Sequence, residues 1–115
     1  MGTRLQSFEA FWPFYVSQHR DPRNQKLHFA GTSLVWLCLA LSLLDSAAWV
    51  PVAFVAGYGF AWVGHFFFEK NRPATFRYPL WSLRGDFRMY RLMLLGGLDR
   101  ELERAQKLFP VRTEP

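Results

Sequence analysis

Two long apolar runs without a single charged side chain constrain this chain more than any other feature of its sequence. The first run, residues 27–44, has 18 residues, and the second, residues 47–68, has 22. A helix needs roughly 20 apolar residues to cross the hydrocarbon core of a bilayer, so each run is about long enough. Asp45 and Ser46 form the polar break between the runs. The sequence therefore predicts two antiparallel helices joined by a tight turn, which together form a transmembrane hairpin.

The basic residues lie only outside this hairpin. All 14 lysines and arginines fall in residues 1–27 or 70–115. A nucleic-acid-binding chain would instead gather them on one face or stripe, so no nucleic-acid partner is expected despite the net charge of +5. Under the positive-inside rule both termini are cytoplasmic, at the inner membrane of a bacterium or the endoplasmic reticulum of a eukaryote. The alternative is a soluble bundle with the hairpin buried in its core.

The segments on either side of the hairpin predict amphipathic helices at the membrane surface. In residues 1–22, aromatic and apolar side chains recur at spacings of three and four, with a break at Pro13. Helices are then expected at 23–44 and 47–69, followed by a connector at 70–84. A last helix is expected at 85–109, bent or broken at Gly96-Gly97, before a tail at 110–115. The predicted fold class is all-α: a small integral membrane protein with one domain over residues 1–115, in which interfacial helices flank a transmembrane hairpin.

All three histidines of the chain fall at one end of the predicted hairpin. His28 begins the first apolar helix and His65 lies near the end of the second, while His19 precedes the turn into the first helix. Asn24 and Glu69, each four residues away from one of these histidines, share a helical face with it. Neutral imidazole is the commonest metal-binding group in proteins, and with a carboxylate it suits iron(II) or zinc. The cluster predicts a metal site; the alternative is a set of hydrogen-bonded interfacial histidines.

Two stretches of the chain resemble motifs of one membrane-protein family. The first stretch, YVSQHRDPRNQKLHFAG, carries a tyrosine, two histidines and an asparagine. The second, VGHFFFEKNRPATF, carries Gly-His, an acidic residue and Arg-Pro-Ala. Over residues 11–76 the chain is similar to the 2-hydroxy fatty acid dioxygenases, iron(II)-dependent enzymes of fatty-acid α-oxidation. It has one apolar hairpin where the longer, eukaryotic-type members have more membrane segments.

The resemblance implies an oxygenase that uses O2 to convert a 2-hydroxy fatty acid to the fatty acid one carbon shorter. The motif residues carried over to this chain are His19, Asn24, His28 and His65. The three histidines would bind iron(II), with Glu69 or Asn24 completing or orienting the ligand shell. The residues expected to bind the substrate are Arg72, Arg77 and Tyr15.

The partners implied by this resemblance are the fatty-acyl substrate, O2 and membrane lipid, and a homo-oligomer stays open. The rival function is a non-catalytic membrane hairpin that scaffolds partners or senses lipid. That rival accounts equally well for the charge pattern and the aromatic content, but it does not explain why every histidine sits at one end.

Overall fold

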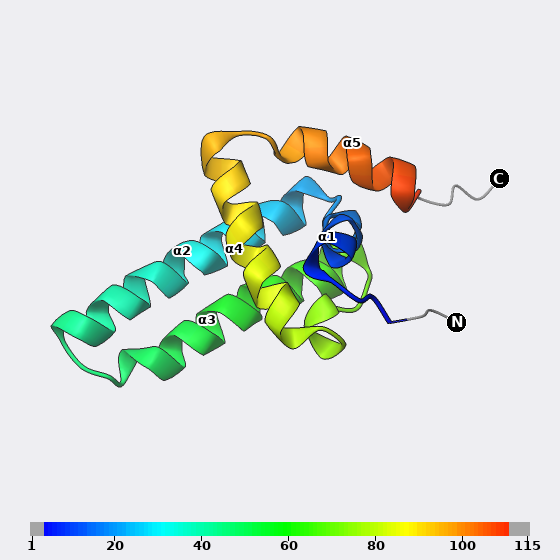
Figure 1. Ribbon diagram of the computed structural model, residues 1–115. Coiled ribbons are helices and arrows are strands. Elements are labelled where there is room, and N and C mark those ends of the chain that lie inside the picture. The colour runs from blue at the N-terminus through cyan, green and yellow to red at the C-terminus, as the bar shows by residue number, and fades with distance from the viewer. Residues whose placement is uncertain (1–3, 111–115) are drawn as a thin grey trace. The chain divides into compact units, whose positions relative to one another are not determined.

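The computed structural model describes residues 4–110, and these residues form helices and connecting turns with no strand among them (Figure 1). They divide into two compact units. The hairpin unit is Asp21–Pro73, and the terminal unit combines Met1–Arg20 with Ala74–Pro115. The all-α prediction is confirmed. Of the tail expected at 110–115, only Pro110 lies within the described residues.

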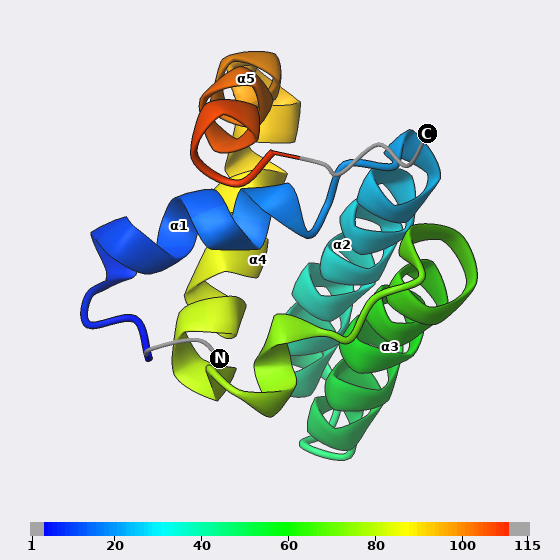
Figure 2. The ribbon, with the colours of Figure 1, turned by 90° about the vertical axis from the view of Figure 1, so that its right-hand side faces the viewer.

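The hairpin unit consists of α2 (Pro22–Leu44) and α3 (Trp49–Val63), which run antiparallel and side by side (Figures 1 and 2). Asp21 begins α2 as its N-cap and accepts the Arg23 N–H at 2.8 Å. At the other end, Trp49 Nε1 donates to Asp45 Oδ2 at 2.9 Å across the turn. After α3 the chain continues into a π-helical turn, η1 (Gly64–Glu69). The second predicted helix, 47–69, thus begins at Trp49 and changes its pitch at Gly64.

Two glycines set the close approach of α2 and α3. A Cβ atom added to Gly31 would lie 2.9 Å from the Phe60 Cβ, and one added to Gly57 would lie 3.0 Å from a Val35 methyl group. A Cβ added to Gly59 would meet nothing within 4 Å. Packing by small residues is typical of helices that associate in membranes, where backbones approach closely.

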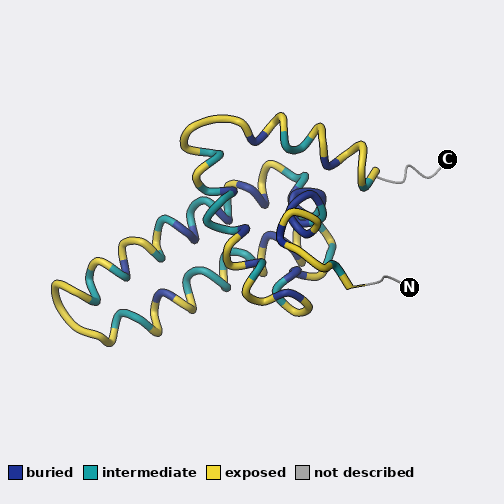
Figure 3. The backbone as a smooth tube through the Cα atoms, in the orientation of Figure 1, coloured by how far each residue is buried: buried dark blue, intermediate teal, exposed yellow. Residues whose placement is uncertain are grey.

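Most of the large apolar side chains on this hairpin are exposed (Figure 3). The segments Pro22–Leu44 and Trp49–Glu69 are long and apolar enough to cross a membrane, judged by length and composition alone. Only 22% and 17% of the residues in their apolar windows are buried, whereas a core helix of a soluble protein is mostly buried. Within the described residues, the hairpin is therefore not enclosed in the core of a bundle. On α2 and α3 the largest exposed fractions among the large apolar residues are 88% for Leu43, 84% for Leu44 and 73% for Val55.

The terminal unit packs α1 (Phe8–Ser17) against α4 (Pro79–Leu95) and α5 (Leu98–Leu108), with a short 3-10 turn, η2 (Ala74–Phe76), before α4 (Figure 2). Its core is aromatic and centred on α1. The indole of Trp12 is tied to α5, because its Nε1 donates to Glu101 Oε1 at 2.6 Å. The fully or almost fully buried aromatic residues are Phe8, Phe11, Trp12, Tyr15 and Tyr78.

Two predicted boundaries in this unit are wrong. The break expected at Pro13 does not occur, because α1 continues through it to Ser17. A proline inside a helix costs about 3 kcal/mol, whereas each large buried side chain contributes about 1.5–3 kcal/mol, and α1 buries several. The connector predicted at 70–84 is also too long, since α4 begins at Pro79 rather than at residue 85. Proline needs no N–H partner in the first helical turn, so it begins this helix.

The break predicted at Gly96-Gly97 is confirmed. Both glycines have positive φ angles, 96° and 113°, which side chains with a Cβ rarely adopt. Helix α4 ends there, and α5 follows as a separate helix.

Candidate metal centre

His28 projects from the first part of α2 and is buried. Its Nδ1 lies 3.1 Å from the Asn24 carbonyl oxygen, one turn earlier in the same helix. A carbonyl oxygen can only accept a hydrogen bond, so Nδ1 must carry the ring proton. In the neutral imidazole the lone pair is therefore on Nε2, the nitrogen that points away from the backbone of α2.

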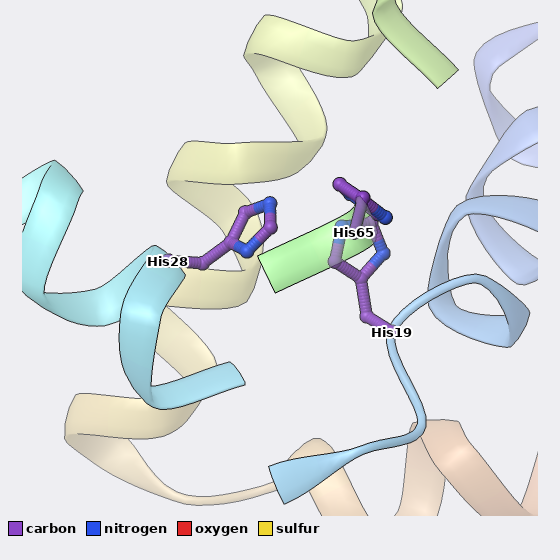
Figure 4. Close-up of side chains that lie close together, drawn as sticks. All are labelled: His19, His28 and His65. Atoms are coloured by element: carbon purple, nitrogen blue, oxygen red, sulfur yellow. The ribbon is translucent and has the colours of Figure 1, made fainter. Parts of the chain in front are cut away.

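His65 lies in η1 and is fixed in the same tautomer by a different group. Its Nδ1 lies 2.7 Å from Asn71 Oδ1, and its carbonyl oxygen accepts the Asn71 N–H at 3.1 Å. Lys70, with a φ angle of 61°, reverses the chain so that Asn71 folds back onto His65. The His28 and His65 rings face each other edge-on, with centroids 5.0 Å apart and planes at 89° (Figure 4). The prediction that the antiparallel helices bring these two histidines together is confirmed.

Glu69 connects the two segments that carry this histidine pair. Its Oε1 accepts the Asp21 N–H at 2.5 Å and the Asn24 side-chain N–H at 3.3 Å. The carboxylate thus holds the first turn of α2 against the end of η1. Both contacts join Glu69 to the start of α2. The α-helical spacing of four residues does not apply here, since η1 is π-helical, and Asn71 is the residue that reaches the His65 ring.

The Asn24 side chain lies with His28, His65 and Glu69 in the polar part of the hairpin unit. Asn24 is 0% exposed, and its Oδ1 has no hydrogen-bond partner among the described residues. It occupies the space next to Gly64, where an added Cβ would lie only 1.8 Å from Oδ1. Buried polar atoms without a partner are rare and call for an explanation such as an ion. An amide oxygen beside two imidazoles is a donor set that suits a divalent cation of the iron or zinc type.

His19 belongs to the terminal unit, just beyond the end of α1. Its Nδ1 lies 2.6 Å from the Tyr15 carbonyl oxygen, which again assigns the proton to Nδ1 and the lone pair to Nε2. Its ring stacks on the Tyr15 ring, with centroids 4.1 Å apart and planes at 25°. All three histidines therefore have the same tautomer, and each is fixed by an oxygen of its own unit.

The residues predicted to bind substrate lie in different surroundings. The Tyr15 ring is buried, and its hydroxyl donates to Asp86 Oδ1 on α4. Arg72 is exposed in the hairpin unit, and Arg77 is exposed in the terminal unit, where its guanidinium lies 5.6 Å from the Tyr78 ring centre.

Sequence reasoning missed Asn71 and Asp86. Asn71 is six residues from His65, which no α-helical pattern selects. Asp86 is 71 residues from its partner Tyr15, and nothing in the local sequence indicates that contact.

Comparison with known proteins gives one match. A family model described as "2-hydroxy-palmitic acid dioxygenase Mpo1-like" matches residues 5–98 of the chain. No curated protein and no solved structure matches it. The matched range covers most of the 115 residues and includes all three histidines.

The contact between Gly64 and Asn24 predicts the effect of a small substitution. Gly64→Ala should lower the free energy of unfolding by about 1–3 kcal/mol, because the new methyl group overlaps the Asn24 side chain. Gly59→Ala is the matched control, since it meets open space and should be neutral or stabilising by up to about 1 kcal/mol. Chemical denaturation in detergent micelles measures both. In an Asn24→Ala background the cost of Gly64→Ala should shrink; equal costs in the two backgrounds would contradict the proposed overlap.

The Asp86 carboxyl predicts a pH dependence of stability. Burial raises the pKa of Asp86 to about 7, and the hydrogen bond from Tyr15 only partly opposes this. The folded chain therefore binds the Asp86 proton more tightly than the unfolded chain does, and this tighter binding stabilises the fold. The stabilisation is full below about pH 4 and is lost as the pH rises through 7. In the variant Asp86→Asn, the new side chain can still accept the hydrogen bond from the Tyr15 hydroxyl, but it does not titrate. The Tm of the parent minus that of Asp86→Asn should thus fall between pH 4 and 7.5; a constant difference would contradict the raised pKa.

Proposed function

The chain belongs to the 2-hydroxy-palmitic acid dioxygenase Mpo1-like family, and from that membership we propose that it is an iron(II)-dependent dioxygenase of fatty-acid α-oxidation. Its substrate is a 2-hydroxy fatty acid, and its product is the fatty acid one carbon shorter. With one O2 consumed, the atoms balance if the lost carbon leaves as carbon dioxide and one water forms.

The observation that carries this proposal is the shared tautomer of the three histidines. Each ring donates from Nδ1 to an oxygen, so each offers the lone pair of Nε2 as a ligand. Metal-binding histidines in proteins are typically held in this way by a second group on the other nitrogen. All three side chains are buried, and the two in the hairpin unit face each other (Figure 4). The proposed ligands are His19, His28 and His65.

The covalent chain limits how far His19 can lie from the start of the hairpin unit. Only Arg20 separates it from Asp21, so the His19 Cα lies within about 8 Å of the Asp21 Cα. The Asp21 N–H donates to Glu69, the last residue of the π-helical turn that carries His65. This short tether supports His19 as the third ligand.

The other residues of the proposed site fix the tautomers of the imidazoles and the positions of the helical segments that carry them. Iron(II), when bound, supplies the activation of O2. Asn71 and the Asn24 carbonyl keep the ring protons of His65 and His28 on Nδ1, so each neutral ring presents its lone pair on Nε2. Glu69 and the Asn24 amide fix α2 and η1 relative to each other, which keeps the ligand directions constant during turnover.

Arg72 and Arg77 are the proposed binding residues for the substrate carboxylate, since a guanidinium pairs well with a carboxylate. The acyl chain would lie along exposed aromatic side chains of η1, among which Phe67 is 67% exposed. Tyr15 is no longer in this set, because its hydroxyl is already bonded to Asp86.

We place the hairpin across a membrane with both termini on the cytoplasmic side. The exposed apolar surface of α2 and α3 supports insertion, because a patch of this kind is rarely left in water. The charge-free turn and the basic flanks support the orientation. The site then lies at the cytoplasmic end of the hairpin, where a fatty acid can enter from the lipid.

The test loads the detergent-purified protein anaerobically with iron(II) and supplies 2-hydroxypalmitic acid and O2. The parent should bind about one iron per chain and form pentadecanoic acid. His28→Ala and His65→Ala should lose the iron and about 100-fold or more of the activity, since removing a ligand exceeds the 10–100-fold effect of an outer residue. Gly59→Ala, at an open position of α3, should keep both.

Circular dichroism should show the same helix content in all four proteins, which separates loss of the metal from loss of the fold. A parent that binds iron but does not shorten the acid would contradict the reaction and keep the metal site. A parent that binds no metal would contradict both and favour the non-catalytic hairpin.

A further inference from the structure

Tyr15 contacts the His19 ring in two ways that together set its orientation. The Tyr15 carbonyl accepts the His19 ring proton at 2.6 Å, and the Tyr15 ring forms the surface on which the imidazole stacks, 4.1 Å away. His19 follows the end of α1 and has no helix of its own to hold it. Any movement of Tyr15 therefore changes the direction of the His19 Nε2.

The Tyr15 ring is in turn held by two adjacent residues of α4. Gly85 lies against the ring, because a Cβ added there would be 3.0–3.2 Å from three of its carbon atoms. Asp86 accepts the hydrogen bond from the Tyr15 hydroxyl. Gly85 thus leaves room for the Tyr15 ring, and Asp86 fixes the hydroxyl end of that ring. Both contacts lie within the terminal unit, as does His19.

The Tyr15 ring is also packed against a second aromatic ring of α1. Trp12 stacks on Tyr15 with centroids 5.5 Å apart and planes at 13°, and its Nε1 is bonded to Glu101 on α5. Trp12 and Tyr15 are therefore each held by a carboxylate from a different helix. Of these two rings, Tyr15 stacks on His19, and Tyr15 is the ring held by residues of α4.

We propose that Gly85 and Asp86 are positioning residues for the metal site: they fix the Tyr15 ring, and through it they set the direction of His19 Nε2. This inference rests on the proposed function, because it takes His19 to be a metal ligand. Metal sites hold their ligands within narrow limits, and outer residues that orient a ligand typically change metal affinity by about 10–100-fold.

The test measures cobalt(II) binding to the purified full-length protein by titration, with the visible absorption of the bound ion as a second readout. Asp86→Ala and Tyr15→Phe both remove the hydrogen bond, so each should weaken cobalt(II) binding by about 10–100-fold and alter the absorption bands. Asp86→Asn keeps an acceptor oxygen at the same place and should stay within about threefold of the parent. Gly85→Ala, which pushes against the ring, should resemble Asp86→Ala.

A purely structural role would lower the Tm of Asp86→Ala but leave the affinity and spectrum of the folded protein unchanged, and that result would overturn the inference. The same holds if Asp86→Asn is as weak as Asp86→Ala. A parent that binds cobalt(II) but, loaded with iron, does not oxidise the 2-hydroxy acid contradicts the reaction while the positioning role is still decided by the titrations. A parent that binds neither ion overturns both.

Discussion

The hydrogen bond from each imidazole Nδ1 to a fixed oxygen is the interaction on which the proposed site depends. Without it, a neutral histidine would exchange its proton between the two nitrogens, and only part of the population would present Nε2. The acceptors are two backbone carbonyls, one turn away in sequence, and one asparagine side chain. Two of the three acceptors therefore follow directly from helical geometry, and only Asn71 requires a special turn.

Hydrogen bonds at the same end of the hairpin explain how the polar side chains of Glu69 and Asn24 are tolerated beside apolar helices. Burying a carboxylate or an amide without partners is costly, so Glu69 and Asn24 satisfy each other and the N-terminus of α2. The Asn24 Oδ1 next to Gly64 has no hydrogen-bond partner among the described residues, and it lies in the part of the hairpin unit where the two imidazoles meet. These contacts of Glu69 and Asn24 lie at one end of the hairpin, while many apolar side chains along the rest of α2 and α3 are exposed.

Much of this arrangement could be predicted from the sequence, because the relevant signals are local. Charge-free runs of helical length predict the hairpin, and antiparallel connectivity brings His28 and His65 to one end. The π-helical turn could not be predicted, since nothing in GHFFFE distinguishes it from an α-helix, and so Asn71 was missed. Asp86 was missed for a different reason: its contact with Tyr15 joins α1 to α4 across most of the chain. Pro13 was misjudged because its local cost is outweighed by the burial of the aromatic face of α1, which spacing alone does not measure.

The central claim is that three imidazoles bind one metal ion through Nε2. X-ray absorption spectroscopy at the iron edge, on the iron(II)-loaded protein in detergent, tests it most directly, because scattering from imidazole rings counts the histidine ligands. The account predicts three imidazoles in the parent and two in His19→Ala, with the other ligands supplied by oxygen. An unchanged imidazole count in His19→Ala, or a parent spectrum without imidazole scattering, would contradict it.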